Sequence, residues 1–93
     1  MKSVLVVIQE PKKDDRKAID LWTTLWQDQE LPNLTIKGIE RLALNVFLIE
    51  LDAALPAFCG LVYRAHKWGV PYKVLYFQEE PEWLHSRLPM TPQ

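Results

Sequence analysis

Short apolar runs and longer amphipathic stretches alternate along the chain. Residues 4–8 are five consecutive branched aliphatic residues, which is typical of a strand buried on both faces. Apolar runs at 46–51 and 72–77 predict two further strands, and the stretch of about 55–68 between them has helical spacing. Gly69 predicts the end of that helix, because glycine suits the left-handed position after a helix.

The first helix is predicted at about residues 14–29, where apolar side chains recur every three or four positions. Asp14 or Asp15 can accept hydrogen bonds from the free amides of its first turn. We expect the second helix to place Pro56 in its first turn and Asp52 at its cap. Its apolar stripe is expected to consist of Leu55, Phe58, Cys59, Val62, Ala65 and His66.

In the segment between the first helix and the strand at 46–51, the spacing of apolar residues fits neither a strand nor a helix. We interpret it as a strand at about 35–42, with a bulge at Gly38 and a tight turn at residues 43–45. Without that turn, the segment is one long strand or a short helix.

The order of elements is therefore β-α-β-β-α-β, which predicts an α+β domain of the ferredoxin-like plait type, with two helices on one face of a four-stranded antiparallel sheet. The domain is expected to span residues 1–78, followed by a tail at 79–93 that contains a short helix after Pro81. The alternative, if the turn at 43–45 is absent, is a small three-stranded parallel α/β sheet.

The composition of the chain makes some classes of function less favourable than others. The chain has 93 residues and a formal net charge of -1, which does not favour binding to nucleic acid or to an anionic membrane. No run approaches the ~20 apolar residues of a membrane helix. The single cysteine, Cys59, cannot form an internal disulfide, which favours a reducing compartment. These features predict a cytoplasmic protein.

Each of the three clear strands is apolar at both odd and even positions. A two-layer plait needs only one apolar face, so the face away from the helices should carry an apolar patch of the size that marks interaction sites. A second copy, another protein, a small ligand or the C-terminal residues Trp83, Leu84 and Leu88 could cover it. The candidate interface residues, or their alternates one position along, are Leu5, Val7, Phe47, Ile49, Leu75 and Phe77.

Few residues suggest catalysis or cofactor binding. Cys59 and His66 are seven residues apart on the predicted helix, about 10 Å along its axis, which is too far for one zinc ion. No glycine-rich phosphate loop or nucleophile motif is present. We therefore expect no cofactor and no metal, and favour a non-catalytic domain that forms a homodimer or binds a protein partner. A polar and aromatic patch is expected from Tyr63, Arg64, His66 and Trp68. The alternative is a ligand binder or enzyme of the dimeric plait type with a pocket near His66, Tyr63 and Glu50.

Overall fold

Six elements follow one another in the computed structural model, which describes residues 2–78. They are β1 (Ser3–Ile8), α1 (Arg16–Gln27), β2 (Ile39–Ala43), β3 (Val46–Glu50), α2 (Leu51–Lys67) and β4 (Tyr72–Phe77). The strands form one four-stranded sheet in the order β2-β3-β1-β4, and every neighbouring pair is antiparallel. The predicted α+β domain with an antiparallel sheet is confirmed, and the alternative of a three-stranded parallel sheet is wrong.

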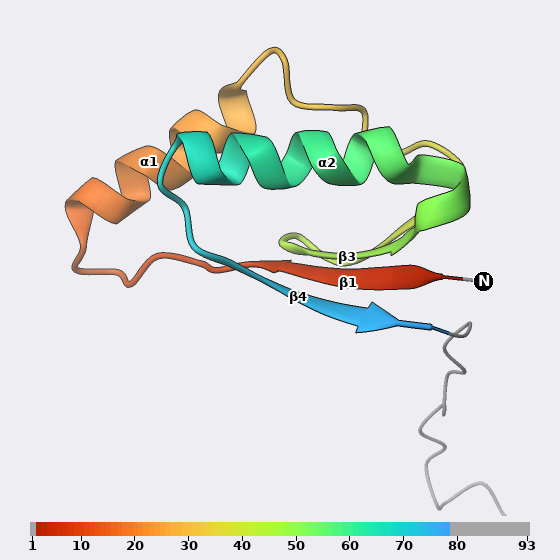
Figure 1. Ribbon diagram of the computed structural model, residues 1–93. Helices are drawn as coiled ribbons and strands as arrows, with labels where there is room; N and C mark the ends of the chain where they lie inside the picture. The colour runs from red at the N-terminus through yellow and green to blue at the C-terminus, as the bar shows by residue number, and fades with distance from the viewer. Residues whose placement is uncertain (1, 79–93) are drawn as a thin grey trace, which may run out of the picture.

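Both helices lie on one face of the sheet (Figure 1). Beneath them, β1 occupies an interior position, paired with β3 on one side and β4 on the other. Its alternate residues Val4, Val6 and Ile8 are buried, and they meet Leu25 of α1 and Leu61 of α2 in one hydrophobic core. The other face of the sheet carries no helix among residues 2–78.

The segment before β3 differs in part from the prediction. β2 begins at Ile39 rather than near residue 35, and the predicted tight turn is confirmed at Leu44 and Asn45. The irregularity in pairing falls between Arg41 and Ala43, not at Gly38. Gly38 instead takes a left-handed φ of +97° just before the strand.

Helix α1 begins as predicted after Asp15, whose side chain accepts a hydrogen bond from the backbone N–H of Ala18 at 3.0 Å. Helix α2 begins at Leu51, earlier than predicted, and is kinked at Ala54, where φ and ψ are −138° and 32°. The prediction of Asp52 as its cap is therefore wrong, because Glu50 occupies that position. Pro56 lies in the first turn after the kink, where its missing N–H costs little.

The stripe that α2 buries agrees only in part with the one expected. Ala65 is buried as predicted and Phe58 packs against the core, whereas Leu55, Cys59 and His66 are exposed. The other buried side chains are Ala54, Ala57 and Leu61. Small alanines on this face let the helix backbone approach the strands closely.

The end of α2 follows the prediction. Gly69 has a φ of +70°. Its N–H donates to the carbonyl of His66 at 3.1 Å, and the N–H of Val70 donates to the carbonyl of Ala65 at 2.9 Å. This pair of bonds is the Schellman motif, and it turns the chain toward β4. The short helix predicted after Pro81 lies outside the described residues. Within residues 2–78, neither helix has the length and apolar character needed to cross a membrane.

Replacing Gly38 with alanine should destabilise the domain more than the same change at Gly69. Both positions need a left-handed backbone, which costs a side-chain-bearing residue about 1–2 kcal/mol. A Cβ at Gly38 would also lie 2.7 Å from the Cβ of Ala53, whereas one at Gly69 would meet only the Cδ1 of Leu21 at 3.8 Å. Overpacking of this kind costs roughly a further 1–3 kcal/mol. Urea unfolding measures both variants, and equal losses would contradict the close approach at Gly38.

Candidate functional site

The sheet face opposite α1 and α2, which we call the open face, is crossed by three rows of side chains. Directly opposed residues of antiparallel strands share a face, so the pairing register defines each row. The middle row runs from β2 to β4 as Glu40, Leu48, Leu5 and Leu75. One flanking row is Ala43, Val46, Val7 and Lys73, and the other is Glu50, Ser3 and Phe77. The centre of the open face is therefore apolar, and its charged residues lie at the margins.

Two of the residues predicted for this surface are on the wrong face. Phe47 and Ile49 are both 0% exposed and belong to the core under the helices. Leu5, Val7, Leu75 and Phe77 do lie on the open face by register, and their neighbours on β3 are Val46 and Leu48. The alternation within β3 did not reveal this, because all four of its apolar residues are large and either set could face the helices.

Strand β4 is an edge strand that exposes apolar side chains on both of its faces. Leu75 on the open face is 56% exposed, and on the helix side Val74 is 40% and Tyr76 is 46% exposed. Neither helix covers this edge among the described residues. The opposite edge differs, because β2 is interrupted by a bulge and carries Glu40 and Arg41, two features that discourage edge-to-edge pairing.

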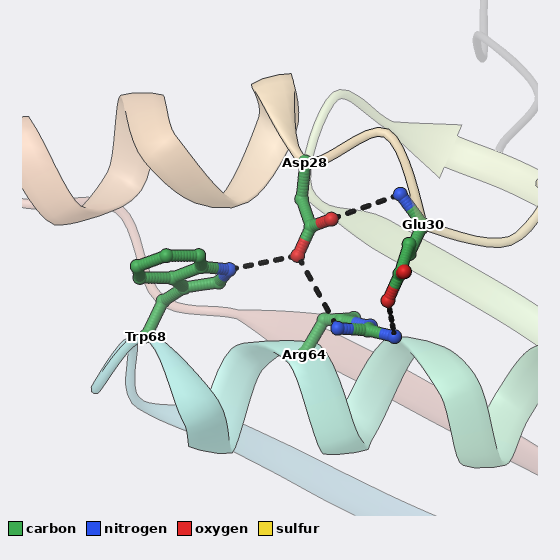
Figure 2. Close-up of polar contacts among 4 residues, drawn as sticks. All are labelled: Asp28, Glu30, Arg64 and Trp68. Carbon is green, nitrogen blue, oxygen red and sulfur yellow. Dashed lines mark hydrogen bonds and ion pairs between the residues drawn. The ribbon is translucent and has the colours of Figure 1, made fainter.

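A polar cluster joins the C-terminal ends of the two helices (Figure 2). Asp28, the residue that ends α1, accepts a hydrogen bond from the indole Nε1 of Trp68 at 2.8 Å. Arg64 of α2 contacts Glu30 at 2.6 Å and Asp28 at 3.7 Å. The second carboxylate oxygen of Asp28 accepts from the backbone N–H of Glu30 at 2.9 Å. The cluster therefore fixes α1 and the following loop onto α2.

The same contacts lower the pKa of Asp28. The indole hydrogen bond from Trp68 has the largest effect, the backbone N–H of Glu30 comes next, and partial burial opposes them by raising the pKa. The positive charges of Arg64 and Lys67 lower it further. The carboxylate is thus held in its charged form by the groups that it joins.

The patch predicted from Tyr63, Arg64, His66 and Trp68 is brought together in part. Arg64 and Trp68 are engaged in the polar cluster, and the guanidinium carbon of Arg64 also lies 5.1 Å from the centroid of the exposed Tyr63 ring. His66 is exposed as well. The predicted pocket near His66, Tyr63 and Glu50 does not form. Glu50 precedes the first residue of α2, so it lies roughly 20 Å along the helix from the other two.

Elsewhere on the domain, two cavities are lined by residues within the described range 2–78. One, of about 350 Å³, is lined by residues from Gln9 to Lys12 and from Gly69 to Pro71, together with Trp22 on α1. The other, of about 510 Å³, lies beside Trp26, the loop after α1 and Arg41 of β2. The sequence pattern singled out neither, because each brings together loop residues that are distant in sequence. For the second cavity, the only sequence feature that could have indicated a site was Arg41, a charged residue within an expected strand.

Trp26 has an unusual environment beside this second cavity. Its ring packs edge-on against Trp22, with centroids 5.4 Å apart, and is tilted against Phe47 at 6.1 Å. Its indole Nε1 is the buried side-chain nitrogen that has no hydrogen-bond partner among the described residues. Because an unpaired buried donor costs about 1–3 kcal/mol, aromatic packing must hold the ring in place.

Comparison with known proteins gives no independent guide to function. No protein-family model matches the chain, and neither the curated proteins nor the solved structures give a match. The site must therefore be argued from this chain's own residues.

Acid should weaken the domain through Asp28. A carboxylate whose pKa is lowered on folding adds stability above its unfolded pKa, of about 4, and that stability is lost as the pH falls through the folded value. We expect the unfolding free energy to fall more steeply below about pH 4 in the native protein than in Asp28→Asn. Asp20→Asn, on the exposed side of α1, is the matched control and should leave the slope unchanged. Urea unfolding between acidic and neutral pH measures this, and identical slopes for native protein and Asp28→Asn would contradict the role of Asp28.

Proposed function

We propose that this chain is a non-catalytic interaction domain that forms a homodimer through its open face. The observation that carries the proposal is the apolar centre of that face, built from Leu5, Val7, Val46, Leu48, Leu75 and Phe77. Monomeric proteins rarely leave a contiguous apolar patch of this kind in water. Its removal from water is favourable by about 25 cal/mol per Å².

The fold that we propose for the domain is the ferredoxin-like plait. Two features support it. The elements occur in the order β1-α1-β2-β3-α2-β4. In the sheet, β3 lies between β1 and β2, and β1 lies between β3 and β4, so each β-α-β unit is split by one strand, as in that fold. Such a plait has a second sheet face available for association.

The charges at the margins of the open face favour a second copy as the partner. Glu50 is on β3 in the same row as Ser3, and Lys73 is on β4 in the same row as Val7. The two charges therefore lie diagonally opposite each other, on either side of Leu5. A two-fold axis that lies in the interface and passes by Leu5 would therefore bring Glu50 of each copy toward Lys73 of the other. The axis runs obliquely to the strands, and the spacings of strands and rows would make the two sheets cross at about 70°, closer to the orthogonal than to the aligned class of sheet packing.

We also propose that the protein works in the cytoplasm. Its one cysteine, Cys59, is exposed on α2 and is far more stable as a thiol in a reducing compartment.

Replacing Leu75 with glutamate should dissociate the homodimer without unfolding the domain. Leu75 is 56% exposed in the single chain, so the charge is tolerated in the monomer but would be buried without a partner in the dimer. Light scattering across a dilution series should give twice the 10.9 kDa chain mass for the native protein and the chain mass for Leu75→Glu.

The matched control is Leu55→Glu, because Leu55 is also exposed, at 48%, but lies on α2. This variant should remain dimeric. A native protein that stays monomeric at all concentrations, or an equal loss of dimer in both variants, would contradict association through the open face.

The orientation of the two copies can be tested by charge reversal. Lys73→Glu should weaken dimerisation, because the pair with Glu50 becomes repulsive, and Glu50→Lys in the same chain should restore it. Exposed ion pairs contribute about 0.2–1 kcal/mol each, so the two pairs predict a change in dissociation constant of roughly two- to thirtyfold. Sedimentation equilibrium measures this constant. A double variant that dimerises more weakly than Lys73→Glu alone would contradict the proposed axis.

A further inference from the structure

The cavity of about 510 Å³ has the size of a small-molecule site. It lies between the end of α1, the loop that follows and the edge of β2, and its lining includes Trp26, Leu31, Pro32, Leu34, Arg41 and Leu44. Most of these side chains are apolar. Arg41 is the one charged residue of the lining.

Arg41 is an exposed residue whose guanidinium makes contacts on two sides. Its Nε and Nη2 atoms donate to the backbone carbonyl of Leu44 at 3.2 and 2.6 Å. Its guanidinium carbon lies 5.0 Å from the centroid of the Phe47 ring and 5.8 Å from that of Trp26. The turn between β2 and β3 and the aromatic rings therefore orient the guanidinium before any ligand arrives, which lowers the entropic cost of binding.

The guanidinium still has capacity to bind. A guanidinium has five N–H donors, and the bonds to Leu44 leave both hydrogens of Nη1 and the second hydrogen of Nη2 available. No carboxylate within residues 2–78 forms an ion pair with Arg41, whereas Arg64 pairs with both Asp28 and Glu30. The only basic residue in the cavity is thus a preoriented cation without an acidic partner in the described part of the chain.

The other polar groups of the lining add donors rather than anionic acceptors. The side-chain oxygen of Asn33 already accepts from the backbone N–H of Thr35 at 2.9 Å and from its hydroxyl at 2.6 Å. The amide nitrogen of Asn33 is left as a donor. An anion is the complementary ligand, and a single guanidinium matches a singly charged carboxylate better than a phosphate of higher charge.

We propose that this cavity binds a small carboxylic acid with an apolar or aromatic body. The carboxylate accepts hydrogen bonds from Arg41, and the body lies against Trp26 and the aliphatic side chains of the loop after α1. Arg41 pairs with Phe47 and so belongs to the helix side of the sheet. The site is therefore separate from the open face, and its occupation does not depend on dimerisation.

The test uses 4-phenylbutyrate as the probe and 4-phenylbutyramide as its uncharged match, titrated into the full-length protein labelled with ¹⁵N. The indole N–H resonance of Trp26 and the backbone amides of Thr35 and Leu44 report on the cavity. We expect saturable shifts with the carboxylate and at least tenfold weaker binding of the amide. Arg41→Gln should weaken carboxylate binding by at least tenfold and leave the affinity for the amide unchanged.

The control variant is Arg16→Gln, which removes an exposed arginine from the start of α1, away from the cavity. It should bind the carboxylate as the native protein does. Equal affinities of the native protein for acid and amide would overturn the proposal even if Arg41→Gln failed to fold. An absence of saturable shifts at the solubility limit of the probe would also overturn it, as would undiminished carboxylate binding by folded Arg41→Gln.

Discussion

The placement of both helices on one side of the sheet is the constraint on which the rest of this structure depends. Strand-helix-strand crossovers are right-handed in nearly all proteins, and the two crossovers here leave α1 and α2 on the same face (Figure 1). Residues Val4, Val6 and Ile8 of β1 are buried by that layer. Leu5 and Val7 of the same strand are left on the other side, although they are equally apolar. Strand β1 is apolar on both faces, but the helices cover only one of them. The apolar face without a helix is the physical basis of the proposed interface.

Small residues hold the helix layer close to the sheet, and one polar cluster joins the two helices to each other. Alanines of α2 face the strands, and Gly38 passes under Ala53 with no room for a side chain. At the other end of the layer, Asp28 and Arg64 join the loop after α1 to α2 (Figure 2). These contacts leave the aromatic side chains of α1 at the border of the core, where Trp26 and Arg41 line a cavity that is open to solvent.

The sequence predicted the elements better than their orientation. Long apolar runs and capping residues such as Asp15 and Gly69 act locally, so the strands, helices and turn at Leu44 and Asn45 could be found from the pattern. The side of β3 that faces the helices could not be predicted, because Phe47 and Leu48 are both large and apolar. Only the pairing of β3 with β1 decides which of them is buried. The buried stripe of α2 was predicted only in part, because the buried Ala54 and Ala57 are small and contribute little to a hydrophobic pattern. The cavity at Arg41 depends on loop contacts, which no local pattern predicts.

We propose that the open face is buried against a second copy of the chain. The most direct measurement is an isotope-filtered nuclear Overhauser experiment on a mixture of chains with labelled and unlabelled methyl groups, which detects only contacts between copies. If the open face forms the interface, intermolecular contacts are expected among the methyl groups of Leu5, Leu48 and Leu75, which form the middle row of that face. Contacts confined to the outer side of α2, or none at concentrations where the protein is dimeric, would contradict the proposal.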